Sequence, residues 1–122
     1  MMTDKFVYDT YALIEILNKN PNYLKYVNEE IIINDFIFAE FCYQLIKDNE
    51  KEIEEILKEV EPAIVKLNPV IIKKAMKFRH QNKKQKLSMT DCISYFQSKE
   101  LEIKFLTGDK EFKDMENVEF VK

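Results

Sequence analysis

Short apolar runs along the chain predict the strands of a buried sheet. Residues 5–8 read Lys-Phe-Val-Tyr, similar apolar runs occupy 31–33, 63–67 and 103–106, and a weaker run at 118–121 is a fifth candidate. Most of these residues are apolar, without the strict alternation of a half-exposed strand. Such runs are typical of strands that are covered on both faces.

Helical spacing of apolar residues fills the segments between these runs. It predicts helices over residues 11–18, 23–28, 35–47, 51–60, 70–82 and 89–99. Strands that alternate with helices favour parallel pairing, with helices on both faces of the sheet. We therefore expect an α/β protein with a three-layer α/β/α fold, a central parallel sheet of four or five strands and a single domain over residues 1–122.

Composition and charge narrow the classes of function. The chain has 19 Lys and Arg against 22 Asp and Glu, a formal net charge of −3, so overall basicity does not predict nucleic-acid binding. The longest mostly apolar run, 36–46, is too short to span a bilayer, and no targeting segment is recognisable. We expect a cytoplasmic protein with no membrane partner. A single glycine, Gly108, excludes glycine-rich phosphate loops.

Three aspartates stand where predicted helices or turns begin. Asp9 directly follows the first apolar run, Asp91 comes three residues after Ser88, and Asp109 follows the run 103–106 and the pair Thr107-Gly108. Aspartate is a favoured N-cap residue, and S-x-x-D has the spacing of a capping box. Helix capping is therefore an alternative explanation for each aspartate.

Glu40 lies in an otherwise apolar helical segment. From 36 to 46 every residue is apolar or aromatic except Glu40 and Gln44, which share one stripe of the helix at i and i+4. If the stripe faces water, it is an ordinary solvent-exposed surface. If it is buried, an unpaired carboxylate there would be unfavourable by several kcal/mol unless a cation or a proton compensates it. The sequence leaves both possibilities open.

The predicted topology brings these four acids together. The carboxyl ends of parallel strands meet at one edge of a sheet, so Asp9 and Asp109 should project there, with Glu40 and Asp91 on nearby helices. Carboxylates that converge in a small volume repel one another unless a divalent cation lies among them. Ligands that are all oxygen select hard ions, here Mg²⁺ or Mn²⁺.

The surroundings of these acids resemble the PIN domain family of metal-dependent ribonucleases. The segments are VYDTYAL around Asp9, FAEFCYQL around Glu40, LSMTDCISY around Asp91 and FLTGDKEF around Asp109. The family pattern is an aspartate after the first strand, a glutamate in a later helix, an aspartate that opens a late helix, and a T-x-D-x-x-F block. Cys92 and Ser94 replace the alanines that commonly follow the third acid, and they are also small.

The resemblance implies an endoribonuclease that cleaves RNA phosphodiester bonds. Its catalytic and metal-binding residues would be Asp9, Glu40, Asp91 and Asp109, which position Mg²⁺ or Mn²⁺ to activate a water. Thr10 and Thr107 would hydrogen-bond a carboxylate or phosphate beside them. The chain length resembles the toxins of VapBC toxin–antitoxin pairs, which implies a small antitoxin partner and frequently a homodimer.

A local cationic stretch contrasts with the net negative charge. Residues 73–86 contain seven Lys and Arg and no acid, and Lys83, Lys84 and Lys86 end the stretch. We infer that these three lysines bind RNA and draw it past the acidic pocket. The alternative is a solvated helix face followed by a polar loop.

Other functions stay open at the level of sequence. The same nuclease fold could act in ribosomal or transfer RNA maturation, and an adjacent antitoxin gene would decide between that role and toxicity. A non-catalytic PIN-like binding module would use the acids only as helix caps and a solvent-facing stripe. A phosphorylatable receiver-like domain also has acids after strands, but Glu40 inside a helix and the late T-x-D block do not suit it.

Overall fold

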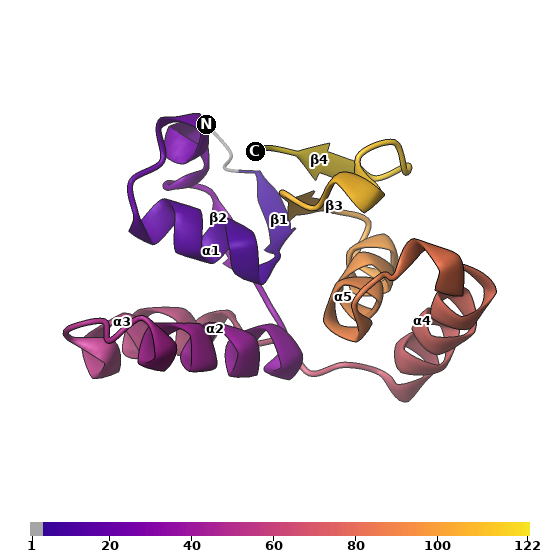
Figure 1. The fold of residues 1–122 in the computed structure, drawn as a ribbon, viewed down its shortest axis with the longest axis horizontal. Coiled ribbons are helices and arrows are strands. Elements are labelled where there is room, and N and C mark those ends of the chain that lie inside the picture. Colours follow the sequence, from indigo (N-terminus) through magenta and orange to yellow (C-terminus); the bar gives the residue numbers. More distant parts are fainter. Residues whose placement is uncertain (1–3) are drawn as a thin grey trace.

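Four parallel strands form one sheet in the computed structural model, which describes residues 4–122 (Figure 1). The strands are β1 (Lys5–Tyr8), β2 (Glu30–Ile32), β3 (Lys104–Thr107) and β4 (Val118–Phe120), in the order β2-β1-β3-β4. The register sets Val7 beside Ile32 on one side and Phe105 on the other. The predicted parallel sheet of four or five strands is confirmed, with four strands.

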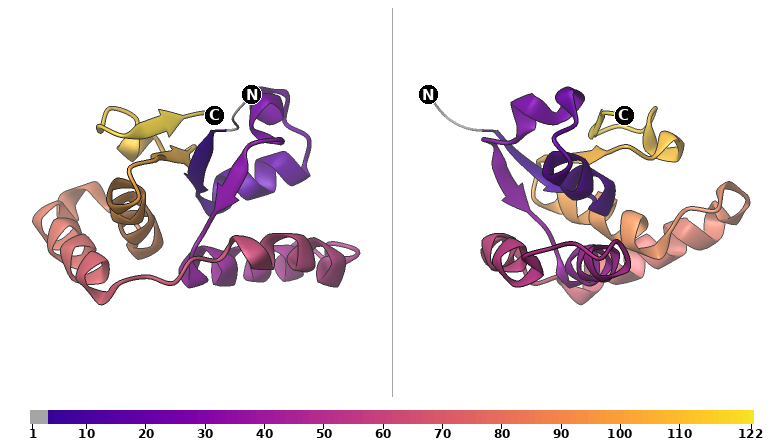
Figure 2. Two further views of the ribbon diagram at one scale, coloured as in Figure 1. Left: turned by 180° about the vertical axis from the view of Figure 1, so that it is seen from behind. Right: turned by 60° about the vertical axis from the view of Figure 1, so that its left-hand side comes forward.

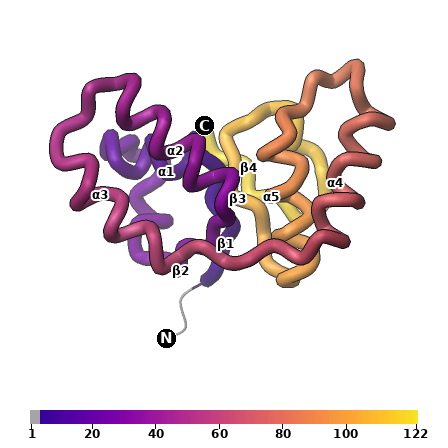
Figure 3. The backbone as a smooth tube through the Cα atoms, turned by 90° about the horizontal axis from the view of Figure 1, so that it is seen from below, coloured from indigo at the N-terminus to yellow at the C-terminus, as the bar shows by residue number. Residues whose placement is uncertain are grey.

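Helices cover both faces of this sheet. They are α1 (Thr10–Leu17), α2 (Asp35–Lys47), α3 (Ile53–Val60), α4 (Pro69–Gln81) and α5 (Met89–Glu100). Both α1 and α5 contact the central strands β1 and β3, and α4 packs on α5. Figure 3 shows α1, α2 and α3 on one side of the strands and α5 and α4 on the other. The predicted three-layer α/β/α fold is confirmed.

The strand order creates an opening at the carboxyl ends of β1 and β3. From β1 the chain passes to β2 on one side, and it later returns to β3 on the other side. Right-handed crossovers in opposite directions place α1 and α5 on opposite faces, so the segments after β1 and β3 diverge. Ligands of open α/β sheets bind at such a switch point. Figure 2 shows the ribbon from two other directions.

The apolar run 63–67 is not a strand of the sheet, which corrects one prediction. It forms only an isolated bridge, in which Ile33 N donates to Ala63 O at 2.9 Å and Val65 N donates to Ile33 O at 2.9 Å. The ladder cannot continue, because α2 begins at Asp35 and leaves no extended residue to pair. The next predicted run, 103–106, therefore forms the third strand of the sheet, β3.

Within the described residues 4–122, short 3-10 helices occupy four connections. They are η1 (Pro21–Tyr26), η2 (Glu61–Ala63), η3 (Lys83–Gln85) and η4 (Lys110–Phe112). The helix predicted over 23–28 corresponds to η1, whose start is set by Asn20 as the N-cap and by Pro21. Among residues 4–122, no helix is long and apolar enough to cross a membrane.

A buried polar network fixes where α2 starts. Asn34 is the N-cap of α2, and its Oδ1 accepts from Phe36 N and Ile37 N at 3.0 Å each. Its Nδ2 donates to Ser94 Oγ at 3.1 Å and to Gln97 Oε1 at 2.8 Å, both on α5. This network ties α2 to α5 and so sets the position of Glu40 beside the carboxyl ends of the strands.

Candidate active site

A cleft of about 600 Å³ contains all four predicted acids. Asp9 and Asp109 follow the carboxyl ends of β1 and β3, Asp91 lies in the first turn of α5, and Glu40 lies on α2. The cleft is lined by Asp9, Thr10, Tyr11, Glu40, Ser88, Asp91, Gly108, Asp109, Lys110 and Lys122. The structure thus gathers residues that are far apart in the sequence, while their catalytic and metal-binding roles stay predictions.

Asp9 is buried at the base of the cleft, with 3% of its surface exposed. Its Oδ1 accepts from Ala12 N at 2.6 Å, which caps α1. Its Oδ2 accepts from Thr107 Oγ1 at 2.6 Å and from Gly108 N at 3.3 Å. Burial raises the pKa of Asp9, and these hydrogen bonds partly oppose that rise. The net result is a pKa of about 6. Asp9 is therefore both a helix cap and a lining residue of the cleft.

Thr107 links the two aspartates that follow the central strands. Its hydroxyl donates to Asp9 and accepts from Asp109 N at 3.0 Å. Asp109 Oδ1 in turn accepts from Glu111 N at 2.9 Å, which caps η4. The T-x-D spacing allows this arrangement, because a Thr hydroxyl readily accepts from the N–H two residues later.

Asp91 is half-buried, and the helix cap beside it is Ser88. Ser88 Oγ accepts from Asp91 N at 3.0 Å. Burial, followed by the charges of Asp9 and Asp109, raises the pKa of the Asp91 carboxyl to about 8, and Glu40 adds to this effect. Repulsion from the neighbouring carboxylates thus adds to the effect of burial on Asp91.

Glu40 is exposed, which decides between the two possibilities left by the sequence. The buried face of α2 carries Ile37, Phe41 and Leu45, and Glu40 lies away from it. Thr10 Oγ1 donates to Glu40 Oε1 at 2.8 Å, so the start of α1 is joined to α2 across the cleft. Both predicted supporting residues, Thr10 and Thr107, thus hydrogen-bond an acid of the cleft.

Two cations in the cleft were not predicted. Lys122 Nζ donates to Gly108 O at 3.2 Å and lies 4.7 Å from the centre of the Tyr11 ring. Lys110 also lines the cleft. Lys110 belongs to the T-x-D-x-x-F block and could have been considered from sequence. Lys122 has no motif around it and reaches the cleft only because β4 pairs with β3.

The chemistry of the cleft fits a hard divalent cation. Its acids offer only oxygen ligands, and a cation would relieve the repulsion that, together with the larger effect of burial, raises the pKa of Asp91. Among the described residues 4–122, however, no three His, Cys, Asp or Glu side chains are grouped closely enough to hold one metal ion directly. Mg²⁺ suits such a site, because it keeps several waters and uses one or two carboxylates.

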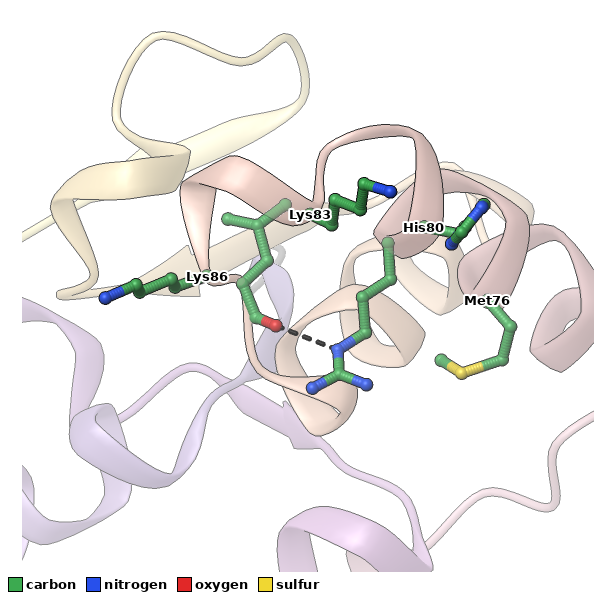
Figure 4. A pocket seen from close by; sticks show the side chains of 6 residues that line it. Met76, His80, Lys83 and Lys86 are labelled. Carbon is green, nitrogen blue, oxygen red and sulfur yellow. Dashed lines mark hydrogen bonds between the residues drawn. The ribbon is translucent and has the colours of Figure 1, made fainter.

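The predicted RNA-binding lysines lie at a second cavity. Lys83 and Lys86 line a cavity of about 300 Å³ together with Arg79, His80, Met76 and Leu87 (Figure 4). Lys84 is exposed and does not line this cavity. The structure therefore separates Lys84 from the other two lysines and adds Arg79 and His80 to them.

Comparison with solved structures supports the fold. A toxin–antitoxin complex from Klebsiella pneumoniae contains a chain with a TM-score of 0.74 and 16% identity, over 93% of this chain and 95% of that one. The crystal structure of PAE2754 from Pyrobaculum aerophilum gives a TM-score of 0.64 and 13% identity, over 98% and 92% of the two chains. At these identities the likeness shows the fold alone.

Comparison with sequence families is more specific. None of the curated proteins compared with this sequence matches it significantly. The PIN domain family model matches residues 6–118, which span all four acids of the cleft. Members of that family are generally nucleases. The resemblance seen in the sequence is thereby confirmed, and the chain belongs to the PIN domain family.

Proposed function

We propose that this protein is a metal-dependent endoribonuclease that hydrolyses RNA phosphodiester bonds. The observation that carries the proposal is the meeting of Asp9, Glu40, Asp91 and Asp109 in one cleft at the carboxyl ends of β1 and β3. Helix capping alone does not explain the cleft, because Ser88 caps α5 and Glu40 lies inside α2. Membership of the PIN domain family supports the same conclusion.

The residues of the cleft have distinct roles in this proposal. Bound Mg²⁺ or Mn²⁺ would neutralise charge and activate water for attack on phosphorus. Asp91 and Asp109 would hold the ion, directly or through water, while Asp9 is kept in place by Thr107 and the N–H groups of Ala12 and Gly108. Lys110 and Lys122 lie where they can offset the negative charge of a phosphate.

Cleavage of a labelled single-stranded RNA tests this function. We expect cleavage in Mg²⁺ or Mn²⁺, none in excess EDTA, and none by the Asp91→Asn variant. Lys19→Gly, outside the cleft, is the control and should cleave as the parent does.

Thermal melts test the metal site separately. Mn²⁺ should raise the melting temperature of the parent more than that of Asp91→Asn. The reason is that a ligand which binds only the native state stabilises it by about 2.7 kcal/mol at a hundredfold excess over Kd.

Two results would contradict the proposal in different ways. Full activity in EDTA would exclude the metal mechanism. If Asp91→Asn still cleaved RNA and its melting temperature rose with Mn²⁺ as much as that of the parent, Asp91 would have no role in metal binding or catalysis. It would then be only a residue in the first turn of α5.

We further propose that the protein is a toxin held by a small antitoxin. A chain of similar fold is part of a toxin–antitoxin complex. An apolar groove of about 350 Å³ offers a surface for such a partner, with Leu17, Phe41 and Ile56 in its wall. Glu52, Glu55 and Glu59 also line the groove, so a basic amphipathic segment of the partner would complement it.

Co-purification with the product of the adjacent open reading frame tests the antitoxin. The parent should retain this product, and the double variant Glu55→Lys/Glu59→Lys should lose it while it still cleaves RNA. Retention by the charge-reversed variant would exclude the groove as the contact surface. Absence of a partner would favour the alternative role in ribosomal or transfer RNA processing. Cytoplasmic location and a homodimer stay predictions.

A further inference from the structure

The cavity beside the end of α4 is cationic. Four of its six lining residues, Arg79, His80, Lys83 and Lys86, carry nitrogen groups that can be positive. The salt bridges found among residues 4–122 involve Lys5, Lys99 and Lys104, so none of them neutralises this cavity. Its positive charge is therefore available to an anion from outside the chain.

Arg79 is held in place at this cavity. Its Nε donates to the backbone oxygen of Leu87 at 2.9 Å, across the turn that joins α4 to α5 (Figure 4). A guanidinium has five N–H donors in a planar fork, so the others stay available while the group is already oriented. Such a fork matches two oxygens of a phosphate.

The other cations are arranged around this turn. Figure 4 shows His80 and Lys83 on one side of it, with Met76 below them, and Lys86 extending to the opposite side. Met76 and Leu87 contribute apolar surface to the wall.

The cationic cavity adjoins the acidic cleft. Leu87 lines the cavity and the next residue, Ser88, lines the cleft, so the two share a wall of consecutive residues. RNA is repelled by the carboxylates of the cleft and requires cations next to it for binding. Arg79, Lys83 and Lys86 meet this requirement without placing further charge among the acids.

We propose that the cavity formed by Arg79, His80, Lys83 and Lys86 binds a backbone phosphate of the RNA strand whose neighbouring phosphodiester enters the acidic cleft. The inference rests on the proposed ribonuclease function and adds the path of the substrate. It also assigns Lys84 no part in that path, since Lys84 lies outside the cavity.

Glycine substitution of Lys86 gives a test that does not compromise folding. Lys86 has a left-handed backbone, with φ 55° and ψ 41°, which glycine adopts without strain. Lys19 has the same type of conformation, with φ 61°, beyond the carboxyl end of α1, whereas the cleft lies at the amino end of that helix. Lys86→Gly and Lys19→Gly therefore remove the same charge from the same kind of backbone position. Neither should lower the melting temperature.

The first measurement is the salt dependence of binding to a short fluorescein-labelled single-stranded RNA. All proteins carry Asp91→Asn and are kept in EDTA, so that the RNA stays intact. Loss of one phosphate contact lowers the slope of log affinity against log salt by about 0.7 for single strands. We expect this decrease for Lys86→Gly, a further decrease when Lys83→Gln is added, and none for Lys19→Gly.

The second measurement uses the single histidine of the chain. His80 lines the cavity, so its ring NMR signals report on this site without ambiguity. Saturating RNA should shift them in the parent and in Lys19→Gly. If the protein without Asp91→Asn cleaves RNA in Mg²⁺ or Mn²⁺, then unmoved His80 signals, or equal salt slopes for Lys86→Gly and Lys19→Gly, would overturn the inference and leave the ribonuclease function standing. A parent that neither binds nor cleaves RNA would overturn both.

Discussion

Single residues of the cleft serve the fold and the candidate chemistry together. Asp9 shows this most clearly, since one carboxylate oxygen caps α1 and the other accepts from Thr107 and Gly108. Burial disfavours the ionised form of Asp9, and each of these hydrogen bonds favours it. The local structure therefore holds a carboxylate that would otherwise be protonated more readily.

The Thr107 hydroxyl should be needed for the ionisation of Asp9. Thr107→Val removes the donor, so the pKa of Asp9 should rise above its value of about 6. The buried Asp9 oxygen and the Asp109 N–H lose a partner, which should lower the free energy of unfolding by about 1–3 kcal/mol. Urea denaturation measures the stability, and carboxyl NMR titration measures the pKa.

The matched control is Thr107→Ser, which keeps the hydroxyl and loses only a methyl group. It should retain the parent's Asp9 pKa and lose about 1 kcal/mol from the missing methyl. An equal rise in the pKa in both variants would show that the hydroxyl is not its cause.

Gly108 is required by the close approach of Tyr11. A Cβ atom at position 108 would clash with the ring carbons Cδ1 and Cε1 of Tyr11. Gly108→Ala should therefore displace the ring and lower the free energy of unfolding by about 1–3 kcal/mol. The Lys122 side chain that lies over this ring should also lose its contact.

A double-mutant cycle checks this steric explanation by urea denaturation. Once Tyr11→Ala has removed the ring, Gly108→Ala should lower stability much less than it does in the parent. Strictly additive losses would exclude the clash between the two side chains.

At the scale of elements, the start of α2 decides where Glu40 lies. Asn34 is fully buried and joins the first turn of α2 to Ser94 and Gln97 on α5. Gln97 Nε2 also donates to Ile33 O at 3.2 Å, at the end of the β2 segment. A strand end and two helices are thus fixed by one set of buried hydrogen bonds.

Substitutions at Asn34 should separate capping from this network. Asn34→Ala loses both, and we expect a decrease of about 2–4 kcal/mol in the free energy of unfolding from an N-cap and a buried bond. Asn34→Ser keeps an oxygen that can cap α2 and should lose about 1 kcal/mol less. Urea denaturation of both variants measures the difference. Equal losses would show that capping contributes little.

At the scale of the whole molecule, the acidic cleft makes stability depend on pH. The pKa of Asp9 is raised to about 6 and that of Asp91 to about 8, above the value of about 4 expected in the unfolded chain. Between about pH 4 and pH 8 these groups bind more protons in the native state than in the unfolded state. Their contribution to stability therefore falls as the pH rises through this window.

The metal-free protein should thus melt at a lower temperature near pH 8 than near pH 5. Asp91→Asn should show a smaller decrease, because its amide does not titrate. Mn²⁺ should oppose the decrease in the parent, since a cation binds the deprotonated carboxylates. Thermal melts in EDTA and in Mn²⁺ provide the comparison. A parent and an Asp91→Asn variant with the same pH profile would assign the dependence to other groups.

The sequence by itself determined the class of fold, the family and the bounds of most elements. The prediction of a helix over 35–47 coincides with α2. The predictions for α1 and α4 differ from the structure by one residue at both ends, and that for α5 by one residue at its carboxyl end. These features depend on local causes, namely apolar spacing and caps such as Asn34 and Ser88. The order of the acids along the chain was also sufficient to indicate a PIN domain.

Tertiary structure decided the features that depend on distant contacts. Asp9 and Thr107 are 98 residues apart, and only the pairing of β1 with β3 sets them side by side. The run 63–67 failed to form a strand because its partner residues turn into α2, although its composition suits a sheet. The apolar pattern of a segment is the same whether or not another strand is available to pair with it. The sequence of one segment therefore could not decide whether that segment joins the sheet.

The same reason explains the exposure of Glu40 and the cations of the two cavities. The sequence allowed the helix stripe that carries Glu40 to be either buried or exposed. In the structure the face with Ile37 and Phe41 packs into the core, which leaves Glu40 exposed to solvent. Lys122 reaches the cleft through β4, and Arg79 reaches Leu87 across a turn. Lys and Arg have long flexible side chains, which can lie along many parts of the exposed surface. Their positions in the sequence therefore do not predict which residues they contact. Those contacts are set only when the chain is folded.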